Sequence, residues 1–232
     1  MFTFVQLIVW NARQIKSKDI ELESIVLNLW GLHTYLSFQG NIGNIMKASG
    51  LKQILSLIYS ENIVNDMLNG KEFYRGSMFF LIDAALNHFI IDDFFPKDDQ
   101  NVIYSQTLFN KIMEDHDEDS VINDEAISAI TNIFKDVKEK LKEHPTGELW
   151  IQFMELMDIV RVVHRAQRTN NFKLYLKSLQ MMLPYFPATG HNNYAKSVHI
   201  FLQDMLALKE TNSRAYELFN NGYFFVRRSD RY

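Results

Sequence analysis

Cysteine is absent from this 232-residue sequence, which excludes disulfide bonds, zinc–thiolate sites and cysteine nucleophiles. No apolar run approaches the roughly 20 residues that a membrane-spanning helix needs. The apolar start "MFTFVQLIVW" lacks a basic leader and leads directly into the polar segment "NARQIKSKD", so a signal peptide is a poor interpretation. Phosphate-binding loops, GxSxG elbows and HExxH motifs are also missing. We therefore expect a soluble, intracellular protein that engages no membrane.

The sequence does contain enough apolar material for a substantial core, because hydrophobic residues make up 47% of the chain. The formal net charge is -4, but the charges are unevenly distributed. Residues 92–144 contain 14 acidic and 6 basic side chains, whereas residues 161–232 contain 4 acidic and 11 basic ones. The basic end could contact nucleic acid, pair with the acidic segment of the same molecule, or simply be solvated.

Apolar residues recur mostly at intervals of three and four, which predicts a mainly α-helical, irregular multi-helix domain of about ten helices. Two N-terminal stretches, "FTFVQLIVW" and "SIVLNLWGL", are rich in β-branched and aromatic residues and predict short strands. A terminal strand or tail is expected in "YFFVRRSDRY". We predict a single helical domain over residues 1–232, which could be subdivided at the acidic loop 115–122.

The segment 71–94 is apolar on almost every face, so we expect this helix at the centre of the fold. Pro187 and Gly190 mark a corner, after which Asn192 or Asn193 is expected to cap the next helix. The other helices are predicted over residues 33–49, 51–59, 61–69, 105–114, 124–144, 148–168, 172–185 and 211–220.

Histidines and carboxylates are the first candidates for chemistry. His164, His191 and His199 could contribute to a metal site, but His191 and His199 are two helical turns apart and too far from each other to share an ion. Hydrogen-bonded structural roles are the favoured interpretation. The acidic residues between 92 and 119 lie in loop-like sequence that offers neither burial nor a metal, so we reject them as a catalytic pair. No metal site or cofactor is predicted from these residues.

A cationic stripe is the second candidate. Its members are spaced 0, 3, 4 and 7, which places them on one face of the predicted helix 148–168, and two lysines follow on the next helix. Such a stripe could bind phosphates. A solvated face near a helix C-terminus, where the macrodipole favours positive charge, is the simpler interpretation and the one that these residues alone favour. The residues are Arg161, His164, Arg165 and Arg168, followed by Lys173 and Lys177.

Four segments together resemble one recurrent protein family: "GLHTYLSFQGNIGNIMKASGLKQILSLIYS", "MLNGKEFYRGSMFFLIDAALN", "MLPYFPATGHNNYAKSVHIFLQDM" and "FFVRRSDRY". Members of that family look like proteins of transposable elements or their descendants. The resemblance covers nearly the whole chain in order. Matching positions that we interpret as structural are Gly43, Gly50, Leu51, Tyr59, Gly70, His191, Asn193, Tyr194 and Asp204.

The resemblance implies an RNase H-like transposase core, in which an aspartate, a second Asp or His and a later helical carboxylate hold two divalent metals. In this chain Val5 occupies the first position and cannot bind a metal, whereas His33 matches the second. The later carboxylate position would lie beyond Tyr232. The resemblance therefore implies a truncated or degenerate member that is not an enzyme and uses a divalent metal only if an intact family site exists.

We therefore expect a non-catalytic, transposase-like fragment that retains contact with DNA through its basic C-terminal region and, in that case, is nuclear. The alternative is a helical protein–protein interaction module that binds no nucleic acid. A metal-dependent nuclease is a third hypothesis, which rests only on His33 and the pattern of the resembled family. The expected nucleic-acid-binding residues are Arg161, Arg165, Arg168, Lys173, Lys177, Arg227 and Arg228.

Overall fold

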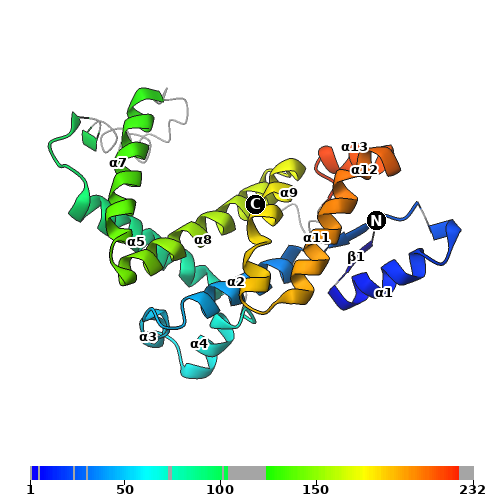
Figure 1. Cartoon of the computed structure of the whole chain (residues 1–232), viewed down its shortest axis with the longest axis horizontal. Coiled ribbons are helices and arrows are strands. Elements are labelled where there is room, and N and C mark those ends of the chain that lie inside the picture. Colours follow the sequence, from blue (N-terminus) through cyan, green and yellow to red (C-terminus); the bar gives the residue numbers. More distant parts are fainter. Residues whose placement is uncertain are drawn as a thin grey trace. The chain divides into compact units, whose positions relative to one another are not determined.

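The computed structural model describes residues 2–4, 6–22, 24–29, 31–72, 75–100, 102–103 and 124–224. It is mainly α-helical, as predicted (Figure 1). The chain forms two compact units: unit 1 comprises Met1–Ser77 and Glu155–Tyr232, and unit 2 comprises Met78–Met154. The chain passes from unit 1 to unit 2 after Ser77 and returns to unit 1 after Met154. The return point lies within one long helix, α8 (Pro145–Arg168).

Unit 1 begins with a strand–helix–strand element. Strand β1 (Phe2–Phe4) pairs in parallel with β2 (Leu27–Leu29), with Phe2 opposite Leu27. Helix α1 (Gln6–Lys16) and the short 3-10 helix η1 (Ile20–Leu22) connect them. Parallel strands require a crossover of this kind, because the chain must return from the end of the first strand to the beginning of the second.

The predicted strand over "FTFVQLIVW" is therefore only partly right, since residues 6–10 are helical. Short apolar runs rich in β-branched residues fit a strand or a buried helix equally well. Tertiary contacts decide the outcome here, because α1 packs on β2 and on α11 (Asn192–Leu206) (Figure 1). The helical turn places Val9 in the core and the side chains of Trp10 and Arg13 opposite α11.

The centre of unit 1 is formed by α2 (Gly31–Ile45), α4 (Glu61–Leu68) and α10 (Tyr185–Ala188). Phe38 of α2 is fully buried and contacts Phe186 and Tyr185 edge-on, at ring-centroid distances of 6.2 Å and 5.8 Å. Helix α2 approaches α4 so closely that a Cβ atom on Gly43 would fall on the backbone of Leu68. Helix α3 (Leu51–Ser56) lies against α4, and the 3-10 helix η2 (Arg75–Ser77) ends this part of the unit.

Unit 1 also contains the part of α8 from Glu155 onward, followed by α9 (Phe172–Met182), α11, α12 (Leu208–Thr211) and α13 (Ser213–Asn220). Phe172 at the start of α9 packs against Phe219 at 5.1 Å and Phe224 at 5.3 Å between ring centroids. The buried amide of Asn28 in β2 donates to the carbonyl of Phe224 at 2.9 Å. The end of the described chain is therefore tied to its beginning.

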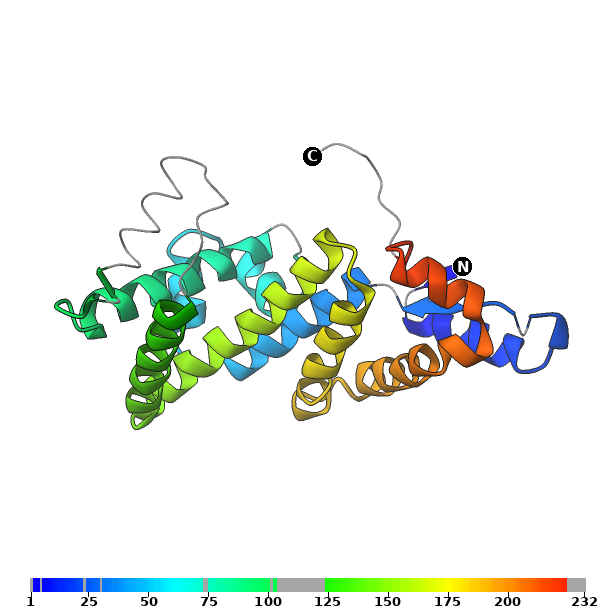
Figure 2. The same cartoon turned by 90° about the horizontal axis from the view of Figure 1, so that it is seen from above.

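Unit 2 consists of α5 (Met78–Phe94), α7 (Asp124–Lys142) and the first part of α8 (Figure 2). Its core includes an apolar cluster, onto which half-buried side chains of α5 and α7 pack. The first turn of α8 begins at Pro145, a position where proline costs no hydrogen bond. The buried members of the cluster are Ile90, Phe95, Val102, Val137, Ile151 and Met154.

The prediction that segment 71–94 lies buried at the centre of the fold is wrong. Only Phe79, Asp83 and Ile90 are buried along α5, whereas Leu81 and Phe89 are exposed. Residues 79, 83 and 90 lie on one side of a helix with 3.6 residues per turn, and residues 81, 85 and 89 lie on the other. Helix α5 carries apolar side chains on almost every face, but only one of its faces is buried.

The corner between α10 and α11 differs from the prediction in one detail. Gly190 adopts φ +84°, as expected for the turn, but the N-cap position of α11 is His191, without a side-chain capping bond. Asn192 and Asn193 lie exposed in the first turn of the helix. The predicted helix 105–114, the acidic loop 115–122 and nearly all of the predicted terminal strand fall outside the described residues.

Candidate nucleic-acid interface

The C-terminal half of α8 separates charged from apolar side chains as its sequence predicts. Arg165 and Arg168 are exposed, and Arg161 is half-buried on the same face. The opposite face carries the buried side chains of Val163 and Ala166. The three arginines therefore share one side of the helix, and the apolar spacing fixes which side that is.

These arginines differ in their electrostatic environment. The guanidinium of Arg161 donates to the carboxylate of Asp158 at 2.7 Å, one helical turn away. Partial burial lowers the pKa of Arg161 from its ordinary value, which leaves it charged at neutral pH. Arg165 and Arg168 lie in the last turn of α8, where the helix dipole favours cations.

Helix α9 adds two exposed cations after a tight turn. Asn170 adopts φ 51°, and the side chain of Asn171 accepts a hydrogen bond from the Leu174 amide at 2.9 Å, which caps α9. Lys173 and Lys177 then lie one turn apart on the exposed side of α9, while Tyr175 is buried on the other. We call Arg161, Arg165, Arg168, Lys173 and Lys177 the α8–α9 cationic surface.

Ion pairing does not neutralise this surface throughout. Within the part of the chain that the structure describes, Arg165, Lys173 and Lys177 form no ion pair with a carboxylate. Arg227 and Arg228, the other two predicted contact residues, lie outside the described residues. The structure thus brings five of the seven predicted residues onto two helices that a three-residue turn connects.

His164 lies within the cationic stripe but differs from the arginines in environment. Its ring is half-buried and packs edge-on against Tyr35 of α2, with a centroid distance of 5.2 Å. Burial, and then the positive charge of Arg168, lower the pKa of His164 below its ordinary value of 6.5. The ring is therefore neutral at neutral pH and adds no positive charge to the surface.

The other histidines occupy separate places. Nδ1 of His191 lies 3.1 Å from the hydroxyl of Thr189, and that hydroxyl donates to Oδ1 of the buried Asn41 at 2.7 Å. This chain of contacts joins the α10–α11 corner to α2. His199 is exposed on α11, and His33 is half-buried on α2. Among the described residues, no group of three or more metal-ligating side chains could hold an ion.

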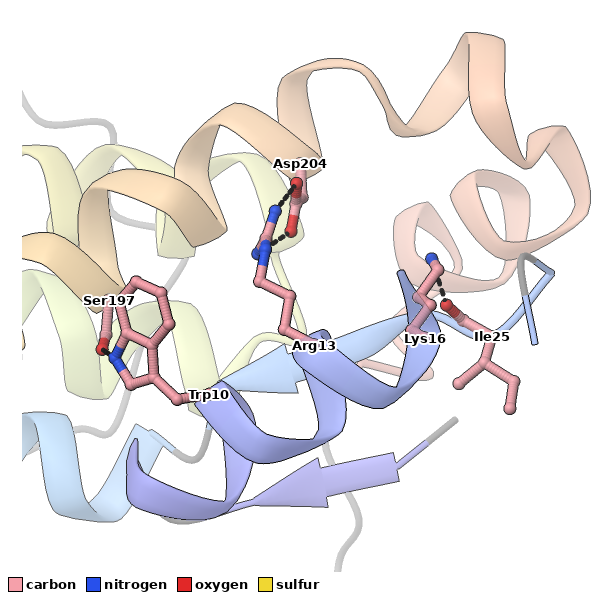
Figure 3. A network of polar contacts seen from close by, with 6 residues as sticks. All are labelled: Trp10, Arg13, Lys16, Ile25, Ser197 and Asp204. Atoms are coloured by element: carbon pink, nitrogen blue, oxygen red, sulfur yellow. Dashed lines mark hydrogen bonds and ion pairs between the residues drawn. The ribbon is translucent and has the colours of Figure 1, made fainter. Parts of the chain in front are cut away.

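Sequence reasoning missed the polar contacts between α1 and α11. Arg13 donates two hydrogen bonds of 2.6 Å to the carboxylate of Asp204, and the indole of Trp10 donates to Ser197 at 3.1 Å (Figure 3). Asp204 was among the positions matching the resembled family, but Arg13 carried no signal, because its helix was not predicted. Only the folded chain brings these residues, more than 180 positions apart, together.

Arg13 and Asp204 line an open groove with a volume of about 1090 Å³. Its wall includes Lys16, which donates to the carbonyl of Ile25 at 2.7 Å (Figure 3). The α12 residue Thr211 also lines the groove. Three cationic and three acidic side chains line it, so it has no preference for one sign of charge. They are Arg13, Lys16, Lys18, Asp19, Glu21 and Asp204.

Formal charge differs sharply between the two compact units. Unit 2 contains 16 acidic and 6 basic residues, whereas unit 1 contains 12 acidic and 18 basic ones. Their formal charges are therefore -10 and +6, which add to the net charge of -4. The α8–α9 cationic surface belongs to the basic unit.

A protein-family model described as Domain of unknown function (DUF8702) matches residues 1–232. The chain belongs to the DUF8702 family. Neither the curated proteins nor the solved structures contain a match to it. In the described part of this DUF8702 chain, the helices are too short or too polar to cross a membrane. The α8–α9 cationic surface and the charge difference between the two units of the chain are thus the main features that point to a function.

Proposed function

We propose that this chain is a helical nucleic-acid-binding module and that the α8–α9 cationic surface contacts the phosphate backbone. The observation that carries the proposal is the exposure of Arg165, Lys173 and Lys177, which have no carboxylate partner among the described residues and belong to a unit with formal charge +6. Phosphate contacts by such side chains release counterions, and this release supplies most of the affinity in sequence-independent binding. No catalytic role is part of the proposal. Descent from a transposase remains a prediction of the sequence resemblance.

The contact is expected to be electrostatic and tolerant of sequence. An affinity of about 10⁻⁴–10⁻⁶ M at physiological salt is typical of such binding. No described residue of the surface is aromatic, so base stacking adds nothing to the expected affinity there. Duplex DNA has a higher phosphate density than a single strand, and we expect it to bind more tightly.

Fluorescence anisotropy with a labelled DNA duplex, titrated between about 50 and 200 mM salt, tests the proposal. The test variant carries Arg165→Gln, Lys173→Gln and Lys177→Gln. Log K falls as log salt concentration rises, with a negative slope of roughly 0.9 per phosphate contact. The loss of three contacts should therefore reduce the magnitude of this slope by up to about 3.

The matched control also removes three positive charges but lies elsewhere, at Lys47→Gln, Lys135→Gln and Lys140→Gln, all exposed. It should retain most of the affinity. Equal weakening by both triple variants would show that only net charge matters, and the absence of binding at low salt would refute the contact itself.

The second candidate function, a protein–protein interaction module, is favoured by a different observation. The acidic unit exposes large apolar side chains on α5, including Leu81 and Phe89. Phosphate contacts do not need such a surface, whereas exposed apolar patches are a common feature of protein–protein interaction sites. The two functions belong to different units and do not exclude each other.

A further inference from the structure

The exposed face of α5 has a specific shape. Leu81 and Phe89 are 63% and 53% exposed and lie two turns apart, about 12 Å along the helix axis. Ala84 and Ala85 lie between them and are also exposed. Two bulky side chains thus flank two small ones, a spacing into which a side chain of a crossing helix can pack.

This face is separate from the core of unit 2. Ile90 and Phe79, on the opposite side of α5, pack into the unit, with Phe79 contacting Phe153 at 6.1 Å between ring centroids. The exposed face continues at its C-terminal end through Phe94, whose ring contacts Phe89 edge-on at 5.8 Å. An apolar helix face that the unit's own core does not use is a common feature of docking surfaces.

The charge around the face determines which partner fits. Asp92 and Asp93 follow the apolar stripe in the last turn of α5, and Asp98 lies just beyond it, all exposed. Asp92 pairs with His88 at 3.3 Å across one turn. Carboxylates at a helix C-terminus are unfavourable for its own dipole, so a cationic partner would relieve this cost as well as meet the unit's charge of -10.

We propose that α5 is a docking site for a basic amphipathic helix of a partner protein. A large apolar side chain of the partner inserts over Ala84 and Ala85, between Leu81 and Phe89. Lysine or arginine side chains of the partner, one to two turns further along, pair with Asp92 and Asp93. An antiparallel arrangement places the positive N-terminal end of the partner helix beside these carboxylates.

The probe is a fluorescein-labelled peptide in which leucines recur at helical spacing and lysines fill the other positions. Two companion peptides carry glutamate in place of lysine, or the same composition in scrambled order. Full-length protein should bind the first peptide at least tenfold more tightly than either companion. Equal binding of the scrambled peptide would show that only the charge of the peptide matters and would overturn the proposal. Equal binding of the glutamate peptide would also overturn it, because the positive charge would then play no part.

Substitutions on the protein locate the site. Leu81→Gln with Phe89→Gln should weaken binding of the lysine peptide at least tenfold. The control, Leu57→Gln with Ile58→Gln, alters two apolar side chains of unit 1 that are 84% and 64% exposed and should leave the affinity unchanged. Equal weakening by both pairs would overturn the assignment to α5.

Ala85→Phe separates shape from hydrophobicity. The phenylalanine would occupy the space between Leu81 and Phe89 and add apolar surface. The affinity for a docking helix should therefore fall roughly fivefold or more, whereas unspecific apolar adsorption would become stronger. Sedimentation of the protein alone checks a further outcome. Self-association that is lost in the Leu81→Gln, Phe89→Gln variant would assign the face to a second copy of this chain and refute the proposed partner.

Discussion

Arg13 and Asp204 form an ion pair between α1 and α11 that is about one-third exposed on both sides, with side-chain exposures of 33% and 37%. Two parallel hydrogen bonds of 2.6 Å fix its geometry. Bidentate arginine–carboxylate pairs of this kind are stronger than single contacts, and partial burial reduces screening by salt. The pair therefore anchors the N-terminal crossover to the C-terminal helices.

We expect Arg13→Met or Asp204→Asn to destabilise the protein by about 1–2 kcal/mol, because each leaves a half-buried partner without its counter-charge. Urea denaturation followed by circular dichroism measures the loss. A double-mutant cycle should give a favourable coupling energy between the two residues. The exposed pair of Lys52 and Glu61 serves as the control, with an expected effect below about 0.5 kcal/mol. Equal effects at the two pairs would contradict the anchoring role.

His164 predicts a pH dependence of stability. Its pKa is lowered in the folded state, first by burial and then by Arg168, from the ordinary value of 6.5. Below pH 6.5 the unfolded chain takes up a proton that the folded chain resists, so this contribution to stability is fully present above pH 6.5 and is lost as the pH falls towards the folded pKa.

NMR titration of the imidazole should therefore give a pKa below 6.5 for His164. The variant His164→Gln should lose less stability than the wild type when the pH is lowered below this value, as measured by denaturant unfolding. An imidazole pKa at or above the ordinary value would contradict the inferred environment beside Tyr35 and Arg168.

Helices of this protein pack according to side-chain size as much as to apolar pattern. The predicted helix 33–49 was expected to carry Phe38, Ile42, Ile45 and Met46 on its apolar face. Phe38, Ile42 and Met46 are buried, and Ile45 is half-buried. The sequence pattern did not reveal that Gly43 marks the crossing with α4, because a glycine within a helix usually indicates only local weakness. The close approach of the two backbones gives this glycine its role.

Gly43→Ala tests the crossing. In an exposed helix, alanine would be more favourable than glycine by about 1 kcal/mol. Here its Cβ would fall on the Leu68 backbone, so we expect a net loss of about 1–3 kcal/mol in the free energy of unfolding. The neighbouring Asn44 is exposed, and Asn44→Ala should be neutral or slightly stabilising. A stabilised Gly43→Ala variant would show that α2 and α4 are further apart.

Helix α5 shows the converse. Its composition is the most apolar of the predicted helices, which led to the expectation of a central position. The described structure buries only the face of α5 that carries Phe79, Asp83 and Ile90. Hydrophobic content thus predicted that the helix forms, but not how much of its surface is covered. The exposed remainder is the basis for the proposed docking site.

The whole chain divides by structure and by charge at nearly the same places. The acidic residues lie mainly in unit 2, and the basic surplus lies in unit 1. The uneven charge was visible in the sequence, but the boundaries of the units were not, because one of them falls within the uninterrupted helix α8. Binding measured separately for the α8–α9 cationic surface and for α5 therefore distinguishes functions of the two units.

The sequence by itself determined the helical class, most helix boundaries, the arginine face of α8 and the uneven distribution of charge. These properties depend on composition and on the spacing of apolar and charged residues along the chain, and a helical period of 3.6 residues determines which of them share a face. Only the tertiary structure decided that residues 6–10 form a helix, that Arg13 meets Asp204, that His164 is neutral and that α5 is half exposed. Each of these depends on contacts between segments far apart in the chain, and no local pattern encodes which segments will meet.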